Sequence, residues 1–147
     1  MCDLTAKMKI RQHEIKSALS IDNLCDNQGE HKMARILVLD DDETRLRHFR
    51  QKLIGNVVEC IKTAQEAIRL LSEEEPFDLL FLDHDLGDKV MVASGPGTGY
   101  EVAEWIRDHK EKRPKDIVIH SYNPAGADNM RAILPGAHYK PGIWLSL

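Results

Sequence analysis

Apolar runs recur along the chain after residue 33, and several of them end abruptly in acidic or other polar residues. Between these runs, apolar residues recur at the three- or four-residue spacing of amphipathic helices. Strands that alternate with helices pair in parallel through right-handed crossovers, so the pattern predicts a doubly wound α/β fold with one five-stranded parallel sheet. The predicted strands are Ala34–Leu39, Val57–Ile61, Asp78–Leu82, Asp116–Ile119 and Ala137–Lys140.

Residues that favour helix ends bound the four predicted helices. The first begins at the N-cap Asp42 and ends at Gly55–Asn56, and the second begins at Thr63. The third and fourth are predicted over Tyr100–Lys112 and Asn123–Leu134. The residues expected on the inward face of the first helix are Leu46, Phe49, Leu53 and Ile54.

Residues 1–33 do not follow this alternation. They mix charged residues with a few apolar ones, among them Ile10, Ile15 and Leu19, which allow one short amphipathic helix. We expect an N-terminal extension over residues 1–33 and one domain over residues 34–147. Three interpretations of the extension stay open: a mobile leader, a segment ahead of a start at Met33, and a helix that docks on the domain or on a second chain.

Composition narrows the class of protein. The 147 residues carry a net charge of −4, so the sequence predicts no general basic surface for nucleic acid. The three cysteines, Cys2, Cys25 and Cys60, are scattered and odd in number, which indicates free thiols in a reducing, cytoplasmic setting. No apolar run approaches the roughly 20 residues of a membrane span. Oligomeric state is left open.

Polar residues cluster where three of the predicted strands end. Asp40 and Asp41 follow the first strand, and the run Asp83–Asp85, Asp-His-Asp, follows the third. The fourth strand is followed by a second polar run, His120–Asn123. In a sheet of order 2-1-3-4-5 these three strands are neighbours, and their carboxyl ends converge at the point where ligands of such folds bind. Carboxylates gathered so closely favour a bound divalent cation.

The segment Gly87–Gly99 contains four glycines and Pro96, so it is predicted to have no regular structure. It follows the third strand directly, and such loops allow backbone amides to approach a phosphate. A flexible excursion built from turn residues fits the same composition.

Residues Ala34–Pro141 resemble the receiver domain of two-component response regulators. The matching features are the acidic pair Asp40–Asp41, the position of the phospho-accepting aspartate at Asp83, the hydroxyl of Ser121 and the pair Lys140–Pro141. The resemblance implies the receiver or flavodoxin-like strand order 2-1-3-4-5. It also implies that Asp41, Asp83 and a backbone carbonyl near Asp85 hold Mg²⁺.

The chain departs from ordinary receivers in His84 and Asp85 after the aspartate, in His120, in one loop and in its last helix. The spacing from Asp83 to Gly99 implies an inserted loop, and the final receiver helix is missing. The runs Phe81–Gly87 and Ile119–Gly126 are similar to the motifs of a divergent branch, the cyclic-phosphate processing receiver domains. That resemblance implies a small-molecule ligand with a cyclic phosphate, either a cyclic nucleotide or a 2′,3′-cyclic phosphate end.

A metal-dependent phosphoesterase would divide the work among these residues. The candidate metal-binding residues are Asp40, Asp41, Asp83 and Asp85, of which Asp40 and Asp85 are also candidates for orienting a histidine or a metal-bound water. An all-oxygen site suits Mg²⁺, whereas a histidine ligand favours Mn²⁺, Fe²⁺ or Zn²⁺.

The candidate catalytic residues follow the third and fourth strands. His84 and His120 are predicted as general acid and base. Ser121 and Asn123 are predicted to donate hydrogen bonds to phosphoryl oxygens, although both also suit the cap of the helix that begins near Pro124.

Other functions compete with hydrolysis. Asp83 is the nucleophile in a variant route, which gives an aspartyl phosphate as in ordinary receivers. A stand-alone phospho-accepting receiver is the second hypothesis, and a binding module that sequesters a nucleotide is the third. The two histidines favour the phosphoesterase or the binding module, because simple phospho-acceptance gives them no task.

Overall fold

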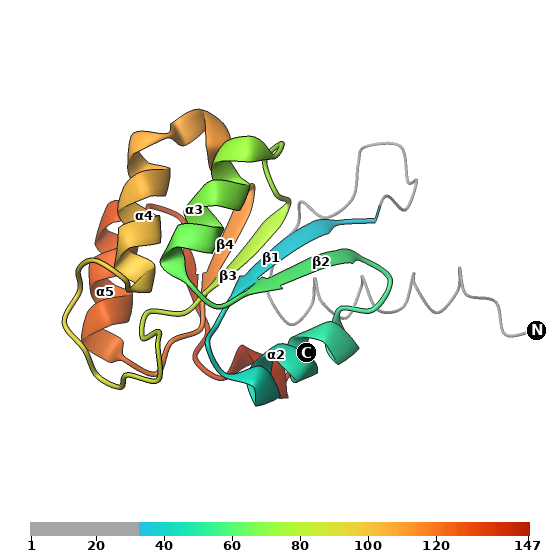
Figure 1. The fold of residues 1–147 in the computed structure, drawn as a ribbon, viewed down its shortest axis with the longest axis horizontal. Helices are drawn as coiled ribbons and strands as arrows, with labels where there is room; N and C mark the ends of the chain where they lie inside the picture. Colours follow the sequence, from blue (N-terminus) through green and yellow to red (C-terminus); the bar gives the residue numbers. More distant parts are fainter. Residues whose placement is uncertain (1–32) are drawn as a thin grey trace, which may run out of the picture.

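The computed structural model of the protein describes residues 33–147. The extension predicted over residues 1–33 therefore lies outside the described residues, apart from Met33. Five parallel strands form one sheet in the order β2-β1-β3-β4-β5, which confirms the predicted arrangement (Figure 1). The strands are β1 (Arg35–Leu39), β2 (Val57–Ile61), β3 (Leu79–Leu82), β4 (Asp116–Ile119) and β5 (His138–Tyr139).

Four α-helices cover the sheet on both faces (Figure 1). They are α2 (Glu43–Lys52), α3 (Ala64–Glu73), α4 (Gly99–Asp108) and α5 (Pro124–Ile133). Two short 3₁₀ helices are also present, η1 (Lys110–Lys112) and η2 (Ile143–Leu145). Helices α3, α4 and α5 pack on one face, whereas α2 and η2 pack on the other. Residues 140–147 contain η2 but no α-helix, in agreement with the predicted absence of the final receiver helix.

Alternate residues of each central strand supply two hydrophobic cores. In β1, Leu37 and Leu39 pack with α3, α4 and α5, and Ile36 and Val38 pack with α2 and η2. All four side chains are fully buried. Burial on both faces explains why these strands are continuous apolar runs and do not alternate with polar residues.

Side-chain caps begin the helices at the predicted positions. Asp42 accepts a hydrogen bond from the Arg45 amide at 2.9 Å, and Asn123 accepts one from the Gly126 amide at 3.0 Å. Thr63 caps α3 in the same way. Each cap satisfies a backbone donor that has no partner within its helix. The same caps fix the direction in which α2 and α5 leave the carboxyl edge of the sheet.

Three predicted boundaries were wrong. Ile54 is 58% exposed because α2 ends at Lys52, so the residue lies beyond the helical face that was expected to bury it. The third helix ends at Asp108, since His109 leaves the helical conformation and Lys110–Lys112 form a separate 3₁₀ turn. The fifth strand has only the residues His138–Tyr139, although the Lys140 amide also donates to the Ile119 carbonyl oxygen of β4 at 2.9 Å.

The inserted loop returns to the sheet at Gly99, where the backbone lies against the end of β3. The Gly99 amide donates to the His84 carbonyl oxygen at 2.9 Å. A Cβ atom at this position would overlap the Asp83 carbonyl oxygen. Only glycine therefore allows α4 to begin so close to the predicted site residues.

We expect Gly99→Ala to lower the free energy of unfolding by at least about 2 kcal/mol, because the added methyl group meets backbone that cannot move aside. Gly95→Ala is the matched control: Gly95 lies in the same loop, and no atom lies within 4 Å of its Cβ position. The control should change stability by less than about 0.5 kcal/mol. Urea unfolding of both variants measures the difference, and equal stabilities would contradict the close approach.

Candidate active site

The carboxyl ends of β1, β3 and β4 border a pocket of about 300 Å³. Five predicted site residues line it: Asp41, Asp83, Asp85, His120 and Ser121. The other lining residues include Arg45, Lys89, Tyr122 and Trp144, which had not been predicted. The convergence expected from the strand order is therefore present in the structure.

Asp40 lies beneath the pocket and is fully buried. Its Oδ2 accepts from Nε of Arg45 at 2.8 Å and lies 3.0 Å from Nε2 of His120. Its Oδ1 accepts from Nη2 of Arg45 at 2.7 Å and from the Asp42 amide at 2.9 Å. Burial alone would raise the pKa of Asp40, but the bonds with His120 and Arg45 outweigh it and hold this pKa below its usual value.

Asp83 is also buried, but its surroundings favour the protonated form. Its Oδ1 accepts from the His84 amide at 2.8 Å, and its Oδ2 lies 3.3 Å from Nη2 of Arg45. Burial raises the pKa of Asp83, and the charge of Asp40 raises it further against the opposing effects of His120 and Arg45. The charge on Asp83 is therefore incompletely compensated, which makes this carboxylate receptive to an added cation.

Arg45 is the site residue that sequence reasoning missed. It is the third residue after the N-cap Asp42, and side chains of a first helical turn point back toward the preceding strand end. That spacing was a signal that could have identified it. The bonds with Asp40 raise the pKa of the guanidinium further, despite its partial burial, so Arg45 is a permanent positive charge in the site.

Asp40, Asp83 and His120 form a cluster that could bind a metal ion. One ligand atom from each residue lies within 4.8 Å of the others, and all three residues are buried. The ring nitrogen of His120 that faces the cluster is Nε2, which lies 3.0 Å from Oδ2 of Asp40. Nδ1, on the other edge of the ring, is buried without a hydrogen-bond partner among the described residues. Two carboxylates and an imidazole fit Mg²⁺ or Mn²⁺, and the nitrogen donor favours Mn²⁺.

Asp41 and Asp85 line the pocket but lie outside this cluster, although both were predicted to bind metal. Oδ2 of Asp41 accepts from the Asp88 amide at 2.6 Å, and Oδ2 of Asp85 accepts from the Met91 amide at 2.6 Å. The inserted loop therefore engages both carboxylates through its backbone. Burial alone would raise the pKa of Asp85, but bonds with Asn123 and His84 hold it below its usual value.

His84 and Asn123 fasten the inserted loop and do not line the pocket. The His84 ring is fully buried, with Nδ1 at 2.7 Å from Oδ1 of Asp85 and Nε2 at 3.0 Å from Oγ of Ser94. Nδ2 of Asn123 donates to Oδ1 of Asp85 and to the Val92 carbonyl, both at 3.0 Å. The structure thus separates the two predicted catalytic histidines, with His120 in the cluster with Asp40 and Asp83 and His84 under the loop.

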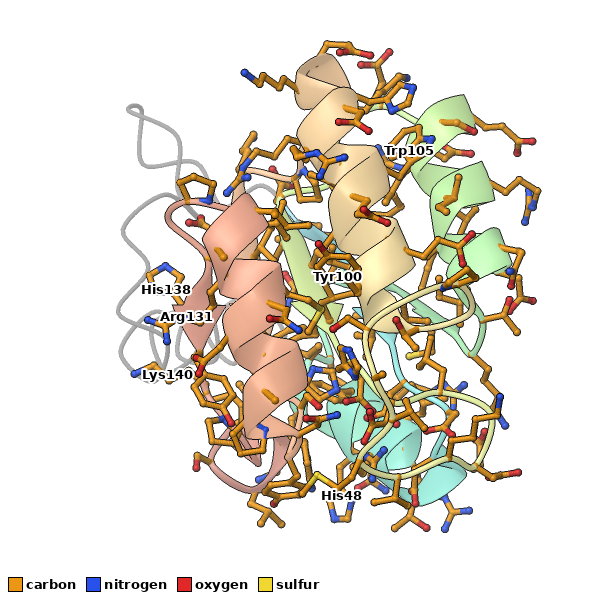
Figure 2. The ribbon with its side chains drawn as sticks, turned by 90° about the vertical axis from the view of Figure 1, so that its left-hand side faces the viewer. His48, Tyr100, Trp105, Arg131, His138 and Lys140 are labelled. Atoms are coloured by element: carbon orange, nitrogen blue, oxygen red, sulfur yellow. The ribbon has the colours of Figure 1, made fainter. Side chains whose placement is uncertain are left out.

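Ser121 and Lys140 differ in their placement. Ser121 lines the pocket, and its Oγ accepts from the Asn123 amide at 3.1 Å, so the hydroxyl proton is available to another acceptor. Lys140 does not line the pocket, and Figure 2 shows it at the outer edge of the fold on the same side as Arg131 and His138. The cation that reaches Asp83 is Arg45, which approaches from α2.

These features agree with what comparisons with known proteins show. The model of the family described as "cyclic-phosphate processing receiver domain" matches residues 35–135 of the chain. The protein belongs to this family. The family name implies a ligand that contains a cyclic phosphate. No curated protein matches the chain.

Receiver domains of known structure share the fold of this cyclic-phosphate processing receiver. The signal receiver domain of a Luxo repressor protein from Vibrio parahaemolyticus superposes with a TM-score of 0.58 at 18% identity, covering 76% of this chain and 79% of that chain. Response regulator protein TrrA from Thermotoga maritima, in complex with Mg²⁺ and BeF, gives 0.57 at 24% identity, covering 74% and 86%.

A third structure is the receiver domain of a sensor histidine kinase from Pseudomonas aeruginosa, with a magnesium ion coordinated in its active site cleft. Its TM-score is 0.55 at 18% identity, and 76% of this chain and 86% of that chain are covered. At these identities the likeness shows the receiver fold. Of the three cysteines predicted as free thiols, Cys60 is free, and Cys2 and Cys25 lie outside the described residues. None of the helices in residues 33–147 is long and apolar enough to cross a bilayer.

The opposite pKa shifts of Asp83 and Asp40 predict opposite effects on stability. With a chelator present to remove divalent cations, we expect Asp83→Asn to raise the free energy of unfolding at pH 7 by about 1 kcal/mol. The fold raises the pKa of Asp83, which means that its charged form destabilises the folded state. Asp40→Asn should lower the free energy of unfolding by roughly 3 kcal/mol. The fold lowers the pKa of Asp40, which means that its charged form stabilises the folded state, and the substitution also deprives Arg45 and His120 of a charged partner.

The pH dependence follows from the same signs. The gain in Asp83→Asn should fade as the pH falls from 7 toward the ordinary value of 3.8, where folded Asp83 is already protonated. The deficit in Asp40→Asn should persist over that range and disappear only below 3.8. Urea unfolding at pH 7, 5 and 4 measures both trends. A loss of stability in Asp83→Asn equal to that in Asp40→Asn would contradict the assignment.

Proposed function

We propose that this receiver is a metal-dependent phosphodiesterase that hydrolyses a cyclic phosphate, either a cyclic nucleotide or a 2′,3′-cyclic phosphate end. The observation that carries the proposal is the buried cluster of Asp40, Asp83 and His120 at the pocket, in a chain of the cyclic-phosphate processing family. In the reaction, water adds to phosphorus and one ring P–O ester bond breaks, so that the product is a phosphomonoester.

The cluster supplies the ligands for a divalent cation. Asp40, Asp83 and His120 would hold it, and when bound it would neutralise charge on the phosphoryl oxygens and acidify the attacking water. His120 was predicted as a general acid or base, but its place in the cluster favours a role as ligand. The magnesium in the receivers from Thermotoga maritima and Pseudomonas aeruginosa supports a cation at this edge of the fold.

The pocket wall supplies groups that recognise the phosphate. Ser121 has a hydroxyl proton free to donate to a phosphoryl oxygen, because its oxygen already accepts from the Asn123 amide. Lys89 adds a positive charge on the inserted loop. Tyr122 is 56% exposed at the same pocket and offers an apolar surface to the organic part of the ligand.

His84 and Asn123 act in this proposal as positioning residues. Both bind Asp85 and residues of the inserted loop, so they fix the loop over the pocket without touching the ligand. Gly126 leaves the space in which the His84 ring lies, since a Cβ there would overlap the ring. The two sequence motifs, Phe81–Gly87 and Ile119–Gly126, therefore contact each other, and through His84 and Asn123 this contact supports the inserted loop.

Turnover of cyclic phosphates with Mn²⁺ or Mg²⁺ tests the proposal, with the phosphomonoester product measured by chromatography. We expect Asp83→Asn and His120→Ala to lower the rate by roughly 100-fold or more, because each removes a proposed metal ligand. Loss of a residue that only hydrogen-bonds to a metal ligand already lowers activity by about 10–100-fold. His109→Ala is the control: its ring stacks on Trp105, whose position is far from α2 in Figure 2, so full activity should remain.

The competing functions give different results in the same experiment. Ligand binding without turnover by the unmodified protein would identify a sequestering module. A stable phosphoryl adduct on Asp83 after treatment with acetyl phosphate and Mg²⁺, with no turnover of any cyclic phosphate, would identify a phospho-accepting receiver. Unchanged turnover in Asp83→Asn would remove the proposed centre.

A further inference from the structure

A single guanidinium nitrogen holds three carboxylates together at the pocket. Nη2 of Arg45 lies 2.7 Å from Oδ1 of Asp40 and 3.3 Å from Oδ2 of Asp83. The same nitrogen is 3.5 Å from Oδ1 of Asp41. Because Asp40 and Asp83 also belong to the candidate metal cluster, Arg45 occupies the space on which the candidate ligands converge.

A divalent cation and this guanidinium group compete for the same carboxylate oxygens. Mg²⁺ binds oxygen ligands at about 2.0–2.1 Å. An ion in contact with both Asp40 and Asp83 would therefore lie next to Nη2, which is already within 3.3 Å of both carboxylates. Two positive charges this close repel strongly, so the bound ion and the present position of Arg45 exclude each other.

Arg45 is the member of this group that is able to move. Its side chain is 26% exposed, compared with 0% for Asp40 and 7% for Asp83. It lies on the first turn of α2 and lines the pocket, so its guanidinium has a path toward solvent. In its present position the guanidinium lies over the ring of Trp144, with Cζ 5.3 Å from the ring centroid.

We propose that Arg45 is an exchangeable counter-ion, which neutralises the acidic cluster when no metal is bound and is displaced when a divalent cation enters. The inference rests on the proposed metal-dependent function and adds its regulation. The protein's metal affinity is then set by a competition between the ion and its own arginine. The exchange also preserves the fold in the absence of metal, because the buried carboxylates always have a positive partner.

Titration with Mg²⁺ by calorimetry tests the competition. We expect Arg45→Met to bind Mg²⁺ about tenfold more tightly than the unmodified protein, because the competing charge is gone and the side chain keeps its length. Arg47→Met is the matched control, since it removes the same charge from an exposed position on the same helix. The control should leave the affinity within about twofold.

Trp144 reports the position of Arg45 independently of activity. The chain has two tryptophans, so Trp105→Phe leaves Trp144 as the only source of tryptophan emission. In this background Mg²⁺ should change the emission as the guanidinium leaves the ring. The change should be much smaller when Arg45→Met is added, although that protein still binds Mg²⁺.

Arg45→Lys keeps the test decisive if Arg45→Met does not fold. Lysine retains the charge but lacks the planar guanidinium that bonds both oxygens of Asp40, so the ion should displace it more easily. The Arg45→Lys protein should therefore bind Mg²⁺ several-fold more tightly than the unmodified protein. Mg²⁺ affinity that is unchanged or weaker in the Arg45 variants would overturn the exchange and leave the proposed function standing. Failure of the unmodified protein to bind Mg²⁺ or Mn²⁺ would overturn both.

Discussion

The receiver fold brings carboxylates from β1 and β3 to one point, and a positive charge has to be there with them. Two unit charges 4 Å apart interact by roughly 4 kcal/mol near a protein surface, which is a large part of the stability of a small domain. The strand order fixes this convergence, since β1 and β3 are neighbours whose register aligns Leu39 with Leu82. Arg45 meets the requirement by bonding Asp40 bidentately and reaching Asp83. That contact ties the first turn of α2 to the carboxyl end of β1.

The location of the candidate site could be predicted from the apolar runs together with the strand order that the resemblance to receivers implies. Buried parallel strands are continuous apolar runs, and their carboxyl ends are marked where the runs stop, at Asp40, Asp83 and His120. In the order 2-1-3-4-5 these three strands are neighbours, which the structure confirms. The caps Asp42 and Asn123 were equally visible, because a short polar side chain before an amphipathic segment has one favoured use.

The division of roles among the site residues could not be predicted, because it depends on the path of the inserted loop. Nothing in the Asp-His-Asp run shows that the His84 ring lies under Gly126 while its backbone amide binds Asp83. Likewise, Asp88 and Met91, whose amides donate to Asp41 and Asp85, both adopt positive φ angles, 59° and 53°. These are non-glycine residues in a sparsely populated conformation, which composition does not reveal.

The loop also bears on the ligands that an ion at this site would have. Oδ2 of Asp41 and Oδ2 of Asp85 each accept from a loop amide, so both carboxylates are already partly satisfied by the protein. The buried cluster instead combines the carboxylates of Asp40 and Asp83 with the imidazole of His120. Mg²⁺ prefers oxygen ligands, whereas Mn²⁺ accepts nitrogen as well, so this donor set would suit Mn²⁺ better than Mg²⁺.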